Sequence, residues 1–340
     1  MRTWLPPLVL SAVFLAGCGS EAADDDVAGA SVQAGAGTGL EVVAAVYPLA
    51  WVAGQIAPDA EVDLLNQGGQ EAHDLDISPA QRAAIETADV VLYTGDIDYQ
   101  PQVETAISSS GGQVVSAAEV AGPDALLSAS EDAHAHEGEQ AHAEGEQAHS
   151  DEEPPAEGAE PHSEEGGVDP HLWFSPSIMA EVATATGAAF AAADPDNAQR
   201  YETNAADLRE QMDALGADLE QMLGQDCRFD EAIVSHAAYG YLLEPFGKEQ
   251  HAVTGVGAES DASAGELAEI VEEIRAEGFT HVLAEPVEGR AGAEAVVAES
   301  GVEMLEILPL DAVSAEQAER GLPDLVREQA TAFATALGCQ

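Results

Sequence analysis

The sequence predicts an α/β fold of two lobes, each with a mostly parallel sheet flanked by helices, joined by one long rigid helix. Three observations support this. Strand and helix patterns alternate in the first third of the chain, one long amphipathic stretch occupies the middle, and the same alternation resumes after it. Alternating strands and helices are typical of parallel sheets covered by helices on both faces.

In the first half, short apolar runs alternate with helix patterns. Ser78 is a typical N-cap and Pro79 suits the first helical position, so a helix should start there. We expect strands at residues 42–48, 61–66, 89–94 and 113–116, and helices at 49–56, 78–88 and 99–108.

The middle of the chain is helical. Ser175 and Pro176 begin a helix that runs to about Ala193. Residues 197–224 then carry one apolar stripe, made of Leu208, Met212, Leu215, Leu219 and Met222. A helix of roughly 28 residues extends about 40 Å, the size of a domain. It could be an ordinary bundle helix, but its place between two α/β halves favours a stiff connection.

The second half repeats the alternation up to the end of the chain. We expect strands at residues 231–235, 250–255, 281–285 and 303–308, and helices at 238–246, 263–277, 291–300 and 315–337. The domain organisation that follows is an N-terminal lobe at 40–175, a helical region at 176–225 and a C-terminal lobe at 226–340.

The N-terminus has the pattern of an export signal. Arg2 precedes an apolar stretch too short to span a bilayer, and Leu15-Ala16-Gly17-Cys18 looks like a bacterial lipobox. We expect residues 1–18 to be a lipoprotein signal peptide ending at Cys18, whose lipid anchors the chain on the extracytoplasmic face of the cell membrane. A plain signal peptide is the alternative. Residues 19–39 lack hydrophobic periodicity and predict a flexible tether.

The chain is very acidic, with 64 Asp and Glu against 10 Lys and Arg and a formal net charge of −54. Such a surface stays soluble at high ionic strength, and it has no basic patch to contact phosphates. The composition therefore excludes nucleic-acid binding.

Three histidines follow or end predicted strands in distant segments: His73, His171 and His236. Ligands collect beyond the carboxyl ends of parallel strands, so these positions suggest a shared zinc site. A lone histidine near a strand is more often a satisfied structural residue.

A histidine- and glutamate-rich segment at 130–166 favours the interpretation of these histidines as metal ligands over the structural one. It holds five of the ten histidines of the chain: His134, His136, His142, His149 and His162. Such tracts are typical of metal binding, and the composition predicts disorder without metal. The alternative is a solvated acidic loop.

Cysteines are few. With Cys18 assigned to the lipid, Cys227 and Cys339 remain, an even pair that favours a disulfide in an exported protein. Neither lies in a short paired metal motif.

The ordered motifs resemble one family. Gly68 to Asp74, Asp169 to Trp173 and Ser235 to Tyr241 together resemble the zinc-binding lipoproteins of ATP-driven metal importers, the cluster A solute-binding proteins, and residues 284–286 and 310–311 resemble that family's late motifs. The resemblance implies two lobes joined by a rigid helix. It also implies a monomer that delivers its metal to an ABC-type membrane permease.

The same resemblance implies His73, His171 and His236 as ligands, with Asp311 at the family's late acidic position. Some zinc-type relatives use a glutamate directly before the first histidine; here that position is Ala72, with Glu71 one residue earlier, which leaves Glu71 a possible outer-sphere group.

Glu285 is a candidate to orient a ligand histidine. Three imidazoles favour Zn²⁺ over Mn²⁺, which prefers more oxygen. His251 and His281 match no ligand motif, and we expect His281 to be structural.

Two alternatives remain open on the sequence. Three histidines with an open position also describe a secreted zinc hydrolase, although no His-Glu-x-x-His motif is present. A manganese-binding transport receptor is the second. We expect a transport receptor and not an enzyme.

Overall fold

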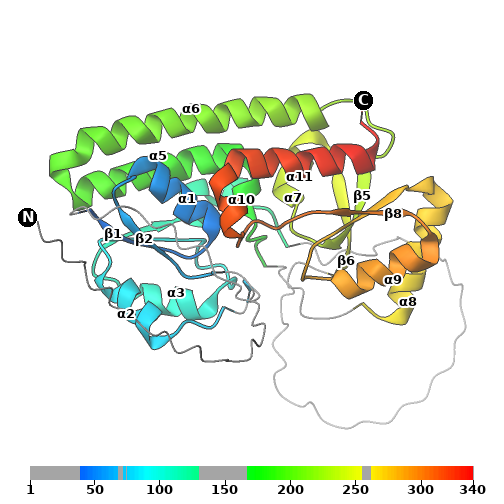
Figure 1. The fold of residues 1–340 in the computed structure, drawn as a ribbon, viewed down its shortest axis with the longest axis horizontal. Helices are drawn as coiled ribbons and strands as arrows, with labels where there is room; N and C mark the ends of the chain where they lie inside the picture. The colour runs from blue at the N-terminus through cyan, green and yellow to red at the C-terminus, as the bar shows by residue number, and fades with distance from the viewer. Residues whose placement is uncertain (1–38, 68–71, 74, 130–166, 255–261, 340) are drawn as a thin grey trace, which may run out of the picture.

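The computed structural model describes residues 39–67, 72–73, 75–129, 167–254 and 262–339. Within these ranges lie two four-stranded sheets with the strand orders β2-β1-β3-β4 and β6-β5-β7-β8. Every pairing between neighbouring strands is parallel. Figure 1 shows the two sheets side by side with helices above and below each of them. The predicted two-lobed α/β class is confirmed.

The N-terminal sheet is formed by β1 (Glu41–Ala44), β2 (Glu61–Leu64), β3 (Val90–Tyr93) and β4 (Gln113–Ser116), and its helices are α1 (Tyr47–Ile56), α2 (Pro79–Thr87), α3 (Pro101–Ile107) and α4 (Ala117–Ala121). The predicted strand at 42–48 was wrong at its end, because α1 already begins at Tyr47. Pro48 lies in the first turn of α1, where a missing N–H costs nothing.

The C-terminal sheet is formed by β5 (Glu231–His236), β6 (Glu249–Thr254), β7 (His281–Ala284) and β8 (Glu303–Glu306), with α7 (Gly240–Leu243), α8 (Ala264–Glu273), α9 (Arg290–Ser300), α10 (Ala315–Arg320) and α11 (Leu322–Leu337). The expected closing helix at 315–337 is broken in two. Gly321 stands at the break with φ of 81°, a conformation that glycine adopts at little cost.

Short helices of other types complete the chain. Four 3-10 turns lie at Pro123–Ala125, Leu172–Phe174, Pro195–Asn197 and Glu244–Phe246. A π-helical turn at Ile274–Gly278 follows α8 directly. The helix expected at 263–277 therefore changes its winding after Glu273.

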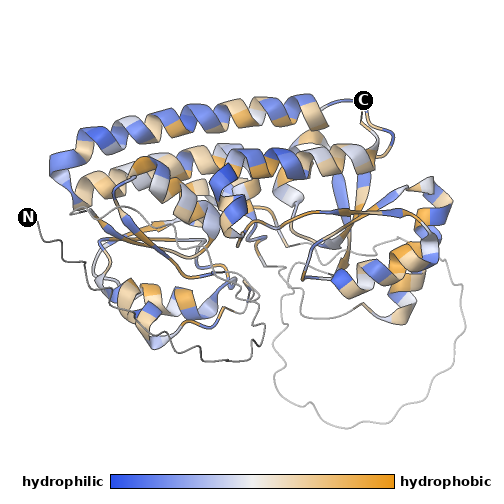
Figure 2. Ribbon diagram, viewed as in Figure 1, coloured by the Kyte–Doolittle hydropathy of each residue, from blue (hydrophilic) through white to orange (hydrophobic). Residues whose placement is uncertain are grey.

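Two long helices connect the lobes, α5 (Pro176–Ala193) and α6 (Ala198–Leu223). Figure 1 shows α6 running along one edge of the molecule, over the N-terminal sheet and up to the C-terminal lobe. Its buried positions recur every three or four residues: Tyr201, Ala205, Leu208, Met212, Leu215, Leu219 and Leu223. The predicted stripe is confirmed except at its end, where Leu223 is buried and Met222 is only partly buried. Figure 2 shows the alternation of hydrophilic and hydrophobic residues along α6 that results.

One apolar core is shared by both lobes, and each lobe has a second core of its own. Alternate residues of β1 divide between the two: Val42 and Ala44 face the shared core, and Val43 faces the core under α2 and α3. In β5, Val234 faces the shared core and Ile233 the core under α8 and α9. The shared core also takes side chains from α1, α5, α6 and α11.

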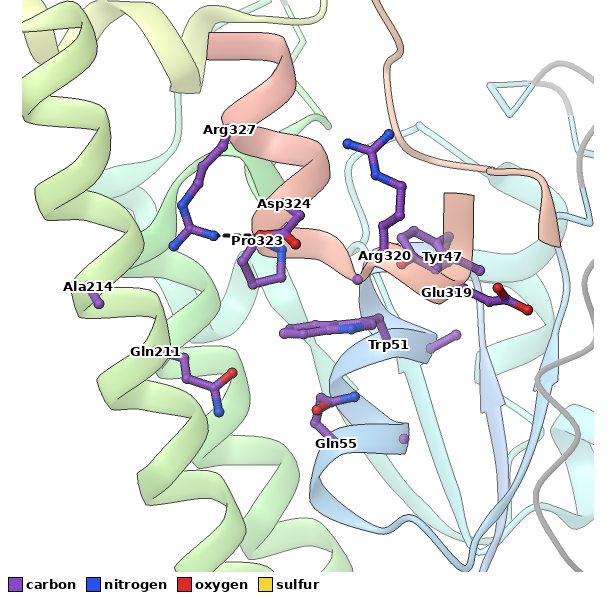
Figure 3. Close-up of a pocket in the computed structure, with 14 residues that line it drawn as sticks. Tyr47, Trp51, Gln55, Gln211, Ala214, Glu319, Arg320, Pro323, Asp324 and Arg327 are labelled. Atoms are coloured by element: carbon purple, nitrogen blue, oxygen red, sulfur yellow. Dashed lines mark hydrogen bonds and ion pairs between the residues drawn. The ribbon is translucent and has the colours of Figure 1, made fainter. Parts of the chain in front are cut away.

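The end of the chain returns to the N-terminal lobe. Figure 3 shows a groove where α1, α6, α10 and α11 meet, with the ring of Trp51 beside Pro323. Arg327 of α11 donates from Nε to Asp218 of α6 and from one terminal nitrogen to Asp324, both at 2.9 Å. Helix α11 also packs against β5 and β7, so it contacts both lobes.

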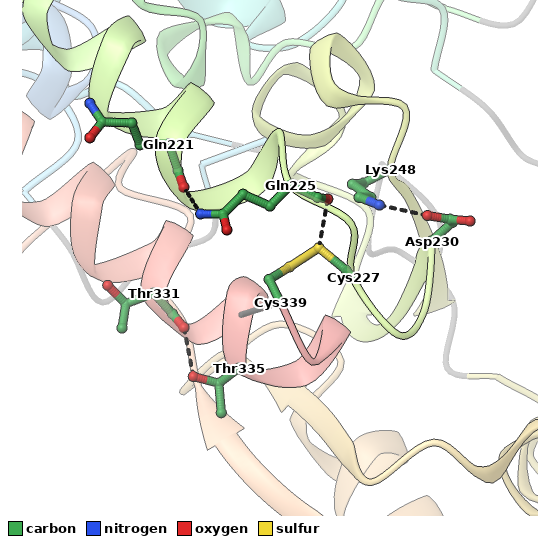
Figure 4. The surroundings of a disulfide bond; sticks show 8 residues. All are labelled: Gln221, Gln225, Cys227, Asp230, Lys248, Thr331, Thr335 and Cys339. Carbon is green, nitrogen blue, oxygen red and sulfur yellow. Dashed lines mark hydrogen bonds and ion pairs between the residues drawn. A yellow bond between two sulfur atoms is a disulfide. The ribbon is translucent and has the colours of Figure 1, made fainter.

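A disulfide joins Cys227, just before β5, to Cys339, just after α11, across 112 residues of sequence. Figure 4 shows it at the turn that follows α6. It ties the end of the chain to the start of the C-terminal sheet.

Several sequence predictions lie outside the described residues: the signal peptide with Cys18, the tether at 19–39 except for its last residue, and the loop at 130–166. Among the helices that the structure does describe, none is both long enough and apolar enough to cross a bilayer.

We predict that the Cys227→Ser/Cys339→Ser variant loses about 2–5 kcal/mol of unfolding free energy, because the disulfide closes a long loop and so restricts the unfolded chain. Denaturant titration with and without reductant measures this. Reductant should weaken the wild-type chain and leave the double variant unchanged; an equal midpoint for both chains under oxidising conditions would contradict the prediction.

Candidate metal site

His236 is the last residue of β5, and its ring is fully buried. Its Nδ1 lies 3.3 Å from Oε1 of Glu285 and 2.8 Å from Oε2 of Glu288. Glu285 is itself fixed: its N–H donates to Oγ of Ser235 at 3.0 Å, and the Tyr239 hydroxyl donates to its Oε1 at 2.8 Å. The carboxylates lie on the Nδ1 side of the ring and orient it, so a metal ligated by His236 would approach from the Nε2 side.

His171 has the same kind of support. It precedes the 3-10 turn Leu172–Phe174 and is 1% exposed. Its backbone N–H and its Nδ1 both donate to Oδ1 of Asp169, at 2.9 and 2.8 Å. This carboxylate fixes the orientation of the ring and again leaves Nε2 for a ligand role.

His73 follows β2 by several residues and enters the site from the N-terminal lobe. Its ring stands edge-on to Tyr99, with ring centroids 4.8 Å apart. Gln100 holds the preceding residue by donating to the Ala72 carbonyl at 3.1 Å. The Nε2 atom of His73 is buried and has no hydrogen-bond partner among the described residues, which is costly for a polar atom unless something else binds there.

The structure brings these three rings together. Their centroids are 5.4 Å apart for His73 and His171, 5.6 Å for His73 and His236, and 5.1 Å for His171 and His236. One nitrogen from each lies within 4.8 Å of the others. Three imidazole nitrogens at this spacing can hold one transition-metal ion with tetrahedral geometry.

Burial sets the protonation of the site. Desolvation, and then the two neighbouring imidazoles, lower the pKa of His73 to about 3, so its ring is neutral at physiological pH. Burial alone would lower the pKa of His236, but the carboxylates of Glu285 and Glu288 outweigh it and raise that pKa well above its usual value. A metal at His236 therefore displaces a proton.

Asp311 is close enough to Glu288 and Glu285, which contact His236, to interact with them electrostatically, but it is not in the group of mutually close ligand atoms. It is 7% exposed, and its Oδ2 accepts from Nδ2 of Asn66 at 2.9 Å. Burial, and then Glu288 and Glu285, raise the pKa of Asp311 to about 7. Holding this carboxylate charged therefore costs free energy unless a cation approaches it.

The segment that carries Asp311 is held in place tightly. Leu310 has φ of 65°, which is strained for a bulky side chain. The indole of Trp173 donates to the Pro309 carbonyl at 2.7 Å, and the Tyr47 N–H donates to the Asp311 carbonyl at 2.8 Å. These bonds tie the late acidic position to the segment of His171 and to α1.

Sequence reasoning missed Glu288. Its loop leaves the carboxyl end of β7 and passes so close to β5 that a Cβ on Gly289 would lie 2.3 Å from the Ser235 carbonyl oxygen. Only glycine fits there, which sets the approach of Glu288 to His236. The signal available in the sequence was a second acid three residues after Glu285, in a loop at a sheet edge where ligands gather.

Other predicted residues are placed as follows. Glu285 lies against His236. The disulfide of Cys227 and Cys339 lies at the amino end of β5, and His236 at its carboxyl end. Outside the described residues lie Glu71, Cys18, His134, His136, His142, His149 and His162.

Comparison with known proteins gives a family match over nearly all of the described chain. Residues 42–336 match the family model of the zinc-uptake complex component A, periplasmic. The chain is 26% identical over 283 residues to the zinc-binding lipoprotein AdcA of Streptococcus pneumoniae serotype 4, covering 83% of this chain and 52% of that protein. It thus spans about half the length of the streptococcal relatives.

A second relative matches over most of its length. The high-affinity zinc uptake system protein ZnuA of Bacillus subtilis strain 168 is 27% identical over 326 residues, covering 94% of this chain and 93% of that protein. Among solved structures, a crystal structure of ZnuA superposes with a TM-score of 0.69 at 22% identity, covering 88% and 99% of the two chains. The AdcAII protein of S. pneumoniae superposes with 0.69 at 19% identity, covering 89% and 100%.

We predict that His73 makes the metal-free protein sensitive to acid. The folded chain resists protonating His73 down to a pKa of about 3, whereas an unfolded histidine takes up a proton at about 6.5. Stability attributable to this group is therefore full above pH 6.5 and is lost progressively as the pH falls toward 3.

Between pH 6.5 and pH 3, the wild type should lose roughly 3 to 5 kcal/mol more of its unfolding free energy than the His73→Ala variant does. Denaturant titrations at a series of pH values measure it, with His281→Ala as the matched control. Parallel pH profiles for wild type and His73→Ala would refute the assignment.

Proposed function

Because the chain belongs to the family of the periplasmic zinc-uptake complex component A, we propose that it is an extracytoplasmic receptor that binds Zn²⁺ between its two lobes and delivers it to an ATP-driven permease. The observation that carries the proposal is the convergence of His73, His171 and His236, with one nitrogen from each within 4.8 Å. The rings come from both lobes, so one ion would join them.

The donor set favours Zn²⁺ over Mn²⁺. Three imidazole nitrogens suit a borderline-soft ion in a tetrahedral site, whereas Mn²⁺ prefers more oxygen ligands. The names of two relatives point the same way: one is a zinc-binding lipoprotein and the other a zinc uptake protein. The buried carboxylates of Asp169 and Glu285 would hold two of the rings in the orientation that the ion needs.

Asp311 is the group that we propose as the fourth ligand. Its carboxyl is buried and its pKa is raised to about 7, so a cation nearby would lower the cost of its charge. Glu288 is the competing donor. Its Oε2 lies against Nδ1 of His236, on the side of the ring away from the nitrogen that would hold the metal, so we assign Glu288 an orienting role.

The remaining parts of the proposal concern the cell surface. Cys18 would carry a lipid that anchors the chain outside the membrane, and a relative named as a lipoprotein supports this. Residues 19–39 would be the tether. The histidines of the loop at 130–166 would gather zinc near the main site, and the chain would act as a monomer.

The chain is not an enzyme. The family that it belongs to is a component of zinc uptake, and the secreted hydrolase considered on the sequence is not favoured. The function proposed here therefore requires capture and release of the ion without chemistry on a substrate.

We predict that His171→Ala lowers Zn²⁺ affinity by more than about 100-fold, because the loss of a ligand exceeds the 10- to 100-fold effect of an orienting group. Competition titration of Zn²⁺ against Mn²⁺ with a chelator measures it. Deletion of residues 130–166 should leave one tight site, and His281→Ala should bind as the wild type does. If the loop deletion removed all tight binding, the histidine cluster would not be the main site.

A second prediction separates the two acidic candidates. Asp311→Asn should lower Zn²⁺ affinity by more than about 100-fold and reduce the number of ligands seen by zinc X-ray absorption, whereas Glu288→Gln should lower the affinity only about 10- to 100-fold and leave that number unchanged. Both substitutions remove one charge and keep the side-chain size, so each controls for the other. A larger loss in Glu288→Gln, with a lost ligand, would assign the fourth position to Glu288.

A further inference from the structure

A second group of metal-ligating side chains lies in the C-terminal lobe. It consists of Glu231, the first residue of β5, His251 in β6, and Glu273, the last residue of α8. One ligand atom from each lies within 4.8 Å of the others. This group shares no residue with the three histidines described above.

Its distance from the histidine site follows from the strand. Glu231 begins β5 and His236 ends it, and five steps of a strand at about 3.3 Å each separate the two ends by roughly 16 Å. One ion cannot contact both groups, so any metal bound here is a separate ion.

The histidine stands where the sheet pattern calls for an apolar residue. In the parallel register Ile233 pairs with His251, and paired side chains point to the same face. Ile233 and Val253 lie in the core under α8. His251 is thus directed from the sheet toward α8, and it is only 7% exposed.

Both carboxylates approach one nitrogen of that ring. Nδ1 of His251 lies 2.8 Å from Oε2 of Glu273 and 3.9 Å from Oε1 of Glu231. In a tetrahedral site with metal–ligand distances of about 2.0–2.2 Å, adjacent ligand atoms are about 3.3 Å apart. The two observed distances lie on either side of this value, so small rotations of the glutamates suffice to enclose an ion.

The surroundings favour a cation. The glutamate side chains are 38% and 26% exposed, so water can reach the site and complete the coordination. Two carboxylates give the site a charge of −2 when the imidazole is neutral, and the net charge of −54 concentrates cations around the chain. The alternative is a purely structural ion pair between protonated His251 and Glu273 that binds no metal ion.

We propose that Glu231, His251 and Glu273 bind a divalent first-row transition-metal ion through one nitrogen and two oxygens. The ion ties together β5, β6 and α8, three elements of the C-terminal lobe. The site is independent of the transported ion, and its donor set of one nitrogen and two oxygens admits Zn²⁺ and Mn²⁺ more evenly than three imidazoles do.

Zinc titration of the full chain tests the proposal in a background of His73→Ala/His171→Ala/His236→Ala, at mildly alkaline pH so that His251 is neutral. Isothermal titration gives the number of ions bound per chain. Adding H251Q to the background should remove one ion. Adding E273Q, at a more exposed position, should remove the same ion and guards against misfolding of the first variant.

H281Q is the matched control. His281 also lies in a strand, as the first residue of β7, but its Nε2 has a single carboxylate nearby, that of Glu303 at 3.7 Å. H281Q should leave the number of ions unchanged. Thermal unfolding adds an independent readout: Zn²⁺ should raise the Tm of the background chain and of its H281Q variant, and not that of the H251Q or E273Q variants.

Equal ion counts in the H251Q, E273Q and H281Q chains would overturn the site, as would a Zn²⁺-dependent rise in Tm that survives H251Q. A different ion count would show that the site of His73, His171 and His236 does not bind zinc. In that case the wild type and the three-histidine background would bind the same number of ions, whatever the behaviour of H251Q.

Discussion

The continuous apolar core shared by both lobes sets the distances between the three histidines of the candidate metal site. It joins β1 on one side and β5 on the other to the same set of helices, α1, α5, α6 and α11. Because a packed core resists deformation, the loops beyond the two sheets meet at a set distance. A disruption within α6 would therefore change the spacing of the three imidazoles without touching any of them.

That meeting point is largely buried and carries perturbed protonation states. His73 is held neutral by burial, while His236 is held protonated by two carboxylates in the metal-free chain. Asp169, Glu285 and Glu288 contact ring nitrogens, and Asp311 is buried nearby. The divalent cation that we propose would relieve the unpaired polar atom of His73 and the charge of the buried acids together. The cost of assembling these groups without metal would be the physical basis for the metal binding that we propose.

The elements could be predicted where one local signal dominates. The stripe on α6 and the residues that start α2 and α5, Ser78 and Ser175, are local signals, and both serines cap their helices in the structure. The boundary of β1 and the break at Gly321 were not predicted. In both places a turn demanded by packing overrides an apolar pattern that continues through it. Glu288 and His251 were missed for a related reason, because each acquires its partners from other strands and helices.

By itself, the sequence determined the class of fold, the alternation within each lobe and the residue types that a metal requires, because periodicity and side-chain chemistry are local properties. Only the tertiary structure decided which of those residues face one another. Parallel register places Ile233 beside His251, and packing of the shared core places His73 beside His236. The distance between groups far apart in the chain depends on how strands pair and how cores pack, and no local pattern contains that information.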